Sequence, residues 1–188
     1  MTPTPDVDIR MIREDLQEIP QFALPDGYAM RAFRPGDRET WVRIEQASDP
    51  TYSLSGATFD AEFGRDLPGM ARRGFFLVAP DGRDVGTVTA WYLRRYLGRP
   101  WGRIHWVAIV PEHRGRGLSR CIMTAAMNRL RALGHRRALL TTQTHRIPAI
   151  RTYLRFGFVP DPSYGDAPAE AWAAVAAHIR HPALARRS

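Results

Sequence analysis

The spacing of apolar side chains near the start of the chain predicts a short helix. Ile9, Ile12, Leu16 and Ile19 recur at intervals of three and four residues, and Pro20 ends the run. Because residues at this spacing share one face of a helix, we expect that face to pack on the rest of the protein.

The next apolar pattern has a different period. Residues 28–33 alternate between apolar and polar positions, as in a strand with one buried face. Asp37 then provides a suitable N-cap for a helix that carries Trp41 and Ile44 inward. The chain should therefore pass from a strand directly into a helix.

The rest of the chain continues to alternate between the two periods. The predicted elements are a less regular helix over 59–67, a β-hairpin of 75–79 and 85–92, a basic aromatic connection over 94–102, a central strand over 104–110, a helix from Leu118 to Gly134, a strand over 138–142, a short helix over 150–157, a strand at 158–159 and a helix over 168–181. This order predicts an α/β fold with a mixed, twisted sheet flanked by helices.

We expect one main domain with two additions. The main domain covers residues 28–160, an N-terminal extension with the short helix covers 1–27, and a C-terminal helical extension covers 161–188 and packs on the domain. The chain has 188 residues, enough for one domain with a sizeable core.

The stretch from Trp106 to Ser119 carries the strongest chemical signal. An apolar strand ends at Pro111, a basic loop with Gly115 and Gly117 follows, and a helix begins after it. The N-terminus of a helix exposes unpaired N–H groups and a partial positive charge, and both favour phosphate binding. Glycines let a ligand approach the backbone closely, so this loop is interpreted as a pyrophosphate cradle.

Two nucleotide motifs are excluded at this loop. A Walker loop requires Lys followed by Ser or Thr after its last glycine, whereas this chain has Leu118 and Ser119. The dinucleotide fingerprint requires three spaced glycines, and this loop has two. The loop instead resembles the Arg-x-x-Gly-x-Gly/Ala motif of the GNAT superfamily of N-acetyltransferases, here Arg114-x-x-Gly117-x-Ser119 with Ser at the third small position.

The resemblance covers about residues 28–159 and implies how acetyl-CoA binds. In this superfamily the central strand splays from its neighbour at a bulge, and its backbone groups hold the pantetheine arm and the acetyl carbonyl. The residues that this implicates are Val107, Ala108 and Ile109 on the strand, and Arg114, Gly115, Arg116, Gly117, Leu118 and Ser119 around the pyrophosphate. Arg146 stands where the family usually has Asn, and it could instead contact a phosphate.

The resemblance also implies two catalytic candidates. Tyr153 lies four residues before Gly157-Phe158, where the family carries a tyrosine that protonates the leaving thiolate. The alternative is a tyrosine that packs a helix on the sheet. His105 is the candidate base, because strand alternation would place it on one face with Val107 and Ile109. The alternative for His105 is a histidine whose hydrogen bonds are satisfied within the sheet.

The composition fits a globular protein and leaves the partner open. The formal charge of +8 would suit nucleic acid, but all 27 basic residues are arginines and they are scattered along the chain. A single Cys121 excludes an internal disulfide, and the dispersed histidines make a metal site unexpected. No apolar run reaches the roughly 20 residues of a membrane span, and the N-terminus lacks a signal-peptide pattern. We expect a cytoplasmic protein.

The predicted function is transfer of an acetyl group from acetyl-CoA to an amine of a small molecule or protein. The resemblance implies direct attack in a ternary complex, which requires no covalent enzyme intermediate and no metal. A non-catalytic acyl-CoA-binding or sensing domain is the alternative, followed by a nucleic-acid-binding protein. The sequence leaves open whether the protein forms a homodimer.

Overall fold

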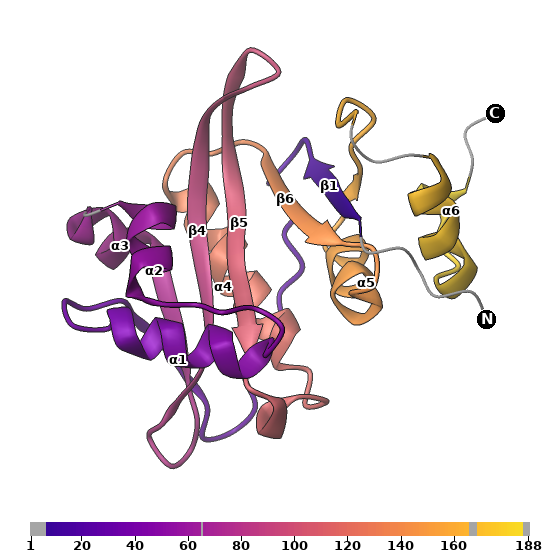
Figure 1. Cartoon of the computed structure of the whole chain (residues 1–188). Helices are drawn as coiled ribbons and strands as arrows, with labels where there is room; N and C mark the ends of the chain where they lie inside the picture. The colour runs from indigo at the N-terminus through magenta and orange to yellow at the C-terminus, as the bar shows by residue number, and fades with distance from the viewer. Residues whose placement is uncertain (1–6, 65, 166–168, 186–188) are drawn as a thin grey trace.

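A seven-stranded mixed sheet forms the centre of the computed structural model, which describes residues 7–64, 66–165 and 169–185 (Figure 1). The strands lie in the order β2-β3-β4-β5-β6-β1-β7. Their bounds are β1 Asp8–Arg13, β2 Ala29–Ala32, β3 Gly74–Val78, β4 Asp84–Tyr96, β5 Arg99–Ile109, β6 Ala138–Gln143 and β7 Val159–Pro160. The β5–β6 pair is parallel, and the other strand pairings in the described residues are antiparallel.

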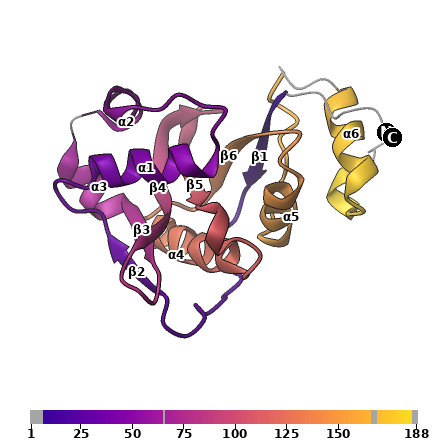
Figure 2. The same cartoon turned by 60° about the horizontal axis from the view of Figure 1, so that its bottom comes forward.

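Helices cover both faces of this sheet. Figure 2 shows α1 and α2 on one side of the strands and α4 on the other. The helices are α1 Arg38–Ser48, α2 Gly56–Phe63, α3 Leu67–Arg73, α4 Leu118–Ala132, α5 Ile147–Arg155 and α6 Ala169–His178, with short 3-10 turns at Pro111–His113 and Pro182–Leu184. The predicted α/β architecture with a twisted mixed sheet is therefore confirmed.

The expected N-terminal helix is wrong, because residues 8–13 form strand β1 between β6 and β7. Ile9 and Met11 are fully buried two residues apart, as in a strand. Leu16 and Ile19 are also buried, but they lie in the irregular segment that follows β1. The helix-like spacing therefore arises by coincidence from a strand and the irregular segment after it. This segment belongs to the sheet, while residues 1–6 lie outside the described part of the chain.

The connection expected over residues 94–102 is also different. Strand β4 continues to Tyr96 and β5 starts at Arg99, so the two strands form one long hairpin that projects beyond its neighbours (Figure 1). Its turn is made by Leu97 and Gly98, which both have positive φ. Pairing continues here because Trp101 is fully buried opposite Leu93, and this contact stabilises both strands.

The irregular helix expected over residues 59–67 is two helices. Gly64 has φ 65° and ends α2. Helix α3 then begins after Asp66, whose side chain accepts a hydrogen bond from the Gly69 N–H. Phe59 and Phe63 both lie on α2 and pack on Trp41 of α1, as their apolar character predicts.

A β-bulge in β5 changes the direction of its side chains. Thr89 pairs with His105 and Thr87 pairs with Ala108, so β5 has one residue more than β4 in this interval. Trp106 within it has φ 49°, an uncommon conformation for a bulky residue. Because of this extra residue, the side chains after the bulge point to the opposite faces from those that strict alternation from His105 would give.

Past the bulge, β5 separates from β6. The pairing between them in the described residues is limited to Gly102 with Ala138 and Arg103 with Leu139. The remaining part of β5, up to Ile109, runs on without a partner on its β6 side. An opening between two neighbouring strands results.

The predicted C-terminal helix is present as α6. Ala171, Val175 and Ile179 are buried in the same apolar cluster as the main core. Arg151 of α5 also donates a hydrogen bond to the backbone carbonyl of His178 at 2.5 Å. The helix thus packs on the domain, and its expected first residue, Pro168, lies outside the described residues.

The bulged strand pair provides a test of the packing. A Cβ at Gly86, which pairs with Ile109, would lie 2.8 Å from the Ala108 carbonyl oxygen. We expect Gly86→Ala to lower the free energy of unfolding by about 1 to 3 kcal/mol, because backbone must move to accept the methyl group. The measurement is urea denaturation. Gly165→Ala is the control, since a Cβ there has open space, and equal stability of both variants would contradict the close approach.

Candidate functional site

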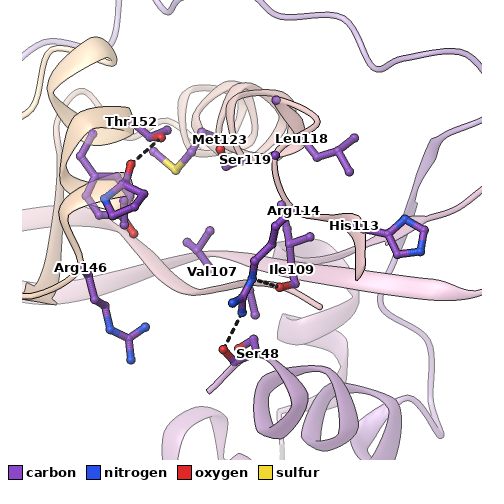
Figure 3. A pocket seen from close by; sticks show the side chains of 16 residues that line it. Ser48, Val107, Ile109, His113, Arg114, Leu118, Ser119, Met123, Arg146 and Thr152 are labelled. Atoms are coloured by element: carbon purple, nitrogen blue, oxygen red, sulfur yellow. Dashed lines mark hydrogen bonds between the residues drawn. The ribbon is translucent and has the colours of Figure 1, made fainter. Parts of the chain in front are cut away.

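A pocket of about 270 Å³ lies at the opening between β5 and β6 (Figure 3). Helix α1, the end of β5, the following loop, the start of α4, and α5 all contribute to its wall. The lining residues are Ser48, Val107, Ala108, Ile109, His113, Arg114, Gly115, Gly117, Leu118, Ser119, Met123, Arg146, Pro148, Ala149, Thr152 and Tyr153. Pockets that enclose a drug-sized ligand occupy roughly 300 to 1,000 Å³, so this one suits a narrow part of a larger ligand.

The pocket brings together most of the residues that the sequence singles out. The predicted residues in its wall are Val107, Ala108, Ile109, Arg114, Gly115, Gly117, Leu118, Ser119, Arg146 and Tyr153. Two predicted residues, Arg116 and His105, are not part of this wall. The loop, the end of β5 and the helix that carries Tyr153 all contribute to this one wall.

The N-terminus of α4 points its unpaired groups toward this loop. Gly117 at the N-cap adopts a left-handed conformation with φ 76° and makes no side-chain cap. The first turn of the 15-residue helix contains no acidic residue. No side-chain cap therefore occupies the first N–H groups of the helix, and no first-turn carboxylate offsets its partial positive charge. This end of the pocket is consequently well suited to bind an anion.

Arg114 ties the loop to two other elements. Its Nε donates a hydrogen bond to the Ile109 carbonyl at 3.0 Å, and its Nη2 donates one to the Ser48 carbonyl at 2.6 Å (Figure 3). The Ser48 carbonyl is at the C-terminus of α1, where a cation is favourable. Arg114 therefore links the end of β5 to α1 across the pocket.

Arg116 lies behind the loop instead of in the pocket. Its guanidinium donates hydrogen bonds to the Tyr28 hydroxyl and to the Glu112 carbonyl, both at 3.3 Å. The Tyr28 hydroxyl also lies 2.8 Å from Nδ1 of His113. Together these contacts fix the 3-10 turn that leads into the loop.

His105 lies on the face opposite Ile109, so the expectation that the two share a face is wrong. The bulge at Trp106 causes this reversal. His105 is partly buried beside α2, where its Nε2 lies 2.7 Å from a carboxylate oxygen of Glu62 and its ring contacts Phe63. Burial lowers the pKa of His105, although Glu62 opposes this effect. The position fits a histidine with satisfied hydrogen bonds.

Tyr153 is buried in α5 and faces the pocket. Burial raises the pKa of its phenol to about 12, and the negative charge of Glu45 acts in the same direction, while Arg146 opposes it. The hydroxyl is therefore protonated throughout the neutral range and can act as a hydrogen-bond donor.

Arg146 is paired with a carboxylate at the other end of the pocket. Its Nη2 lies 2.5 Å from Oδ2 of Asp49, the residue that follows α1, and its guanidinium lies 5.8 Å from the centre of the Tyr52 ring. Figure 3 shows Arg146 and His113 on opposite sides of Val107. A contact between Arg146 and a phosphate is a proposal. The ion pair with Asp49 is another role that an arginine can have at this position.

Glu45 is a residue near the site that the sequence analysis missed. It is 5% exposed, and its Oε1 is buried without a hydrogen-bond partner. Burial raises its pKa to about 8, and Arg146 acts against this rise. A signal was present in the sequence, because Glu45 follows Trp41 by four residues and so lies on the apolar face of α1.

Neither a metal site nor a membrane span is found in the described residues. No group of three or more His, Cys, Asp or Glu side chains there could hold a metal ion. Helices in the same residues are all too short or too polar to cross a bilayer. Cys121 is a buried free cysteine on α4, and burial raises the pKa of its thiol.

Comparison with known proteins gives a consistent family match. The sequence model described as "Acetyltransferase (GNAT) family" matches residues 38–158. A mycothiol acetyltransferase of Thermomonospora curvata is 29% identical over 152 residues, covering 78% of this chain and 50% of that protein. One of Pseudarthrobacter chlorophenolicus is 31% identical, covering 75% and 45%. The chain thus spans about half the length of these curated relatives.

Solved structures share the fold. A GCN5-related N-acetyltransferase from Sphaerobacter thermophilus aligns with a TM-score of 0.68 at 21% identity, covering 83% of this chain and 49% of that one. A chain from Agrobacterium tumefaciens str. C58 aligns with a TM-score of 0.55 at 26% identity, covering 72% and 95%. The second comparison shows that the fold described above can account for nearly the whole of a separate chain.

The buried carboxyl of Glu45 should make stability depend on pH. Its folded pKa of about 8 exceeds the ordinary value of 4.5, so the folded state holds this proton more tightly than the unfolded state. The resulting stability is fully present below the unfolded pKa and is lost as the pH rises through the folded pKa. We expect Glu45→Gln to remove this loss, which is on the order of 3 to 5 kcal/mol at most.

Urea denaturation at pH 5, 7 and 9 measures this effect as the difference between variant and wild type. Glu39→Gln is the matched control, because Glu39 is on the same helix with its side chain 73% exposed. If the difference between Glu45→Gln and wild type stays constant with pH, the Glu45 carboxyl titrates normally.

Proposed function

The chain belongs to the acetyltransferase (GNAT) family, and from this membership we propose that it transfers the acetyl group of acetyl-CoA to an amine of a small molecule. One observation carries the proposal beyond the family. A single pocket joins the uncapped N-terminus of α4, the unpaired edge of β5 and the buried hydroxyl-bearing Tyr153. The helix N-terminus is suited to an anionic donor, the strand edge to its thioester, and the hydroxyl to the leaving thiolate.

In this proposal the loop and α4 bind the pyrophosphate of acetyl-CoA. The backbone N–H groups from Gly115 to Ser119 are suited to this because both glycines have positive φ, which turns consecutive N–H groups toward one side. The loop arginines supply positive charge. Arg114 lines the pocket. Arg116 lies behind the loop, where a hydrogen bond to the Tyr28 hydroxyl holds its guanidinium, and it adds positive charge from that side.

The unpaired edge of β5 holds the thioester end of the donor. Val107, Ala108 and Ile109 all line the pocket, and β6 supplies no backbone partner at this level of the described sheet. Their main-chain groups are thus placed to hydrogen-bond the pantetheine amides and to polarise the acetyl carbonyl.

Tyr153 is proposed to donate a hydrogen bond, and then a proton, to the departing sulfur. A phenol with a pKa near 12 is a weaker acid than an ordinary tyrosine. However, the burial that raises the pKa of the phenol also raises that of a thiol in the same pocket, so the difference between donor and acceptor is smaller than the phenol value suggests.

For the acceptor we propose a small amine and no particular compound. The curated relatives are named mycothiol acetyltransferases, and this chain covers about half of each. We therefore carry over acetyl transfer and a small-molecule acceptor, without the particular substrate. We also propose a cytoplasmic location, with which a single free cysteine is consistent. A homodimer is a separate proposal.

Acetyl-CoA binding tests the phosphate cradle. Gly117→Gln places a long side chain and a left-handed backbone strain at the start of α4, so we expect the Kd for acetyl-CoA to rise at least tenfold, equivalent to about 1.4 kcal/mol. Gly134→Gln is the control, because Gly134 has φ 84° near the opposite end of α4 with open space around it. Calorimetry that gave equal affinities for both variants would contradict the assignment.

Turnover tests the role of Tyr153. We expect Tyr153→Phe to leave acetyl-CoA affinity unchanged and to lower kcat by about 100- to 10,000-fold, the usual range for general acid catalysis. The assay follows release of free thiol from acetyl-CoA with a panel of small primary amines. Tyr164→Phe is the control, since Tyr164 lies outside the pocket and contacts Arg10. Normal turnover by the Tyr153→Phe enzyme would return Tyr153 to a packing role.

A further inference from the structure

Arg103 is a partly buried cation whose charge is not matched by an ion pair. Its Nε is buried and has no hydrogen-bond partner in the described residues. Glu62 acts on it electrostatically, but the Glu62 carboxylate lies 2.7 Å from Nε2 of His105. Because a guanidinium stays charged at neutral pH, the folded protein carries the cost of removing this charge from water. An anion bound beside Arg103 would offset that cost.

The register of the sheet places a second arginine on the same face. Arg103 of β5 pairs with Leu139 of β6, which in turn pairs with Ile12 of β1. Directly opposed residues on neighbouring strands point the same way, so these three side chains share a face. Alternation along β1 and β6 adds Arg10 and Thr141, which pair with each other. Two guanidinium groups and a hydroxyl are therefore carried by three adjacent strands of one face.

This face lies on the side of α2 and is open over β6 and β1. His105, which alternates with Arg103 on β5, contacts α2. A Cβ at Gly102, which points the other way, would lie 2.9 Å from Leu130 of α4. Figure 2 shows α1 and α2 over β4 and β5 on the first side, whereas α5 lies with α4 on the other side. A ligand can therefore approach the polar side chains of β1 and β6, which are only partly buried.

The second guanidinium is held in place by aromatic rings. The Arg10 guanidinium lies 4.7 Å from the centre of the Tyr96 ring and 4.2 Å from that of the Tyr164 ring. The nearby Asp161 carboxylate accepts a hydrogen bond from the Tyr96 hydroxyl, and its backbone N–H donates to the Arg10 carbonyl at 3.0 Å. These contacts restrict the guanidinium, while its Nε is buried without a hydrogen-bond partner in the described residues.

Arg103 also marks one end of the opening in the sheet. Pairing between β5 and β6 stops at this residue, and the pocket begins further along β5 at Val107. In the proposed function, the pyrophosphate lies at the start of α4 and the thioester lies against Val107 to Ile109. The donor thus occupies the α4 end of the opening, and the acceptor has to approach the acetyl carbon from the end that Arg103 closes.

We propose that Arg103 and Arg10, together with the Thr141 hydroxyl, bind an oxyanion of the acceptor, so that the substrate is a small amine that also carries a carboxylate or phosphate. This inference rests on the acetyl transfer proposed above. The planar fork of a guanidinium matches both kinds of oxyanion. Extended strand from Arg103 to Val107 spans roughly 13 Å, so a chain of several bonds separates the amine from the anionic group.

The test compares acceptors that differ only in charge. The probes are ω-amino carboxylic acids of increasing chain length, the primary amide of each, and the ω-aminoalkyl phosphates. We expect wild-type kcat/KM at the best length to be about 10- to 100-fold higher for an anionic acceptor than for the amide, the usual value of hydrogen bonds to a charged group. The carboxylate and phosphate series show which oxyanion fits better. Equal kcat/KM for acids, phosphates and amides at every length would overturn the proposal.

Substitution of Arg103 locates the effect. We expect Arg103→Gln to reduce the preference for the anionic acceptor to less than threefold while kcat/KM for the amide stays unchanged, and Arg103→Lys to restore part of the preference. Arg94→Gln is the control, because it removes the same charge from an exposed position on the same hairpin. An Arg103→Gln enzyme that keeps the wild-type preference, or that loses activity equally on acid and amide, would contradict the role of Arg103. If this variant does not fold, Arg10→Gln should lower the preference in the same way.

Binding separates this proposal from the proposed function. Calorimetry measures the Kd of the best anionic acceptor for protein saturated with CoA, and it requires no turnover. We expect Arg103→Gln to raise this Kd at least tenfold and Arg94→Gln to leave it unchanged. Wild-type protein that binds the anionic acceptor through Arg103 but acetylates no amine would overturn the proposed function and keep the oxyanion site. Acetylation of amines with equal Kd values in wild type and Arg103→Gln would overturn the oxyanion site alone.

Discussion

The site depends on one extra residue in β5. The bulge at Trp106 turns the strand, and pairing with β6 stops at Arg103, so the edge of β5 from Val107 onward has no partner on its β6 side in the described residues. Positive φ at a bulky residue is unfavourable. The ring of Trp106 packs against Trp41 with their centres 5.0 Å apart, and this contact helps to offset the strain. Core packing on one face of the sheet thereby maintains the opening in the sheet.

Two arginines hold helix α1 against this opening from opposite sides. Arg114 donates a hydrogen bond to the Ser48 carbonyl at the end of the helix from the loop before α4, and Arg146 binds Asp49 from the start of α5. The loop over residues 114–119 and the helix that bears Tyr153 are thus both connected to α1. A shift of α1 would change both contacts at once, which makes the position of this helix a common constraint on the two halves of the pocket.

The sequence was most informative where chemistry requires particular local residues. The loop over 114–119 and the strand before it could be predicted because glycine conformation and helix termini act over a few residues. The face of His105 could not, since a bulge depends on pairing with another strand and leaves no period in the sequence. Strand β1 was misread for a related reason. Ile9 and Met11 alternate with Asp8 and Arg10, but Ile12 is buried as well and breaks the alternation, so the apolar residues also fit a helical spacing.

Glu45 shows what a sequence pattern can contribute when it conflicts with packing. A carboxylate on the apolar side of α1 lowers stability at neutral pH, because the folded protein raises its pKa and finds no partner for Oε1. Glutamine or methionine would fit a similar space without an ionisable group. This ionisable residue opposes folding at neutral pH and interacts electrostatically with Tyr153 and Arg146, so the apolar packing of α1 does not account for it. Local conflicts of this kind can be sought in sequence by asking which charged residue interrupts an apolar helix face.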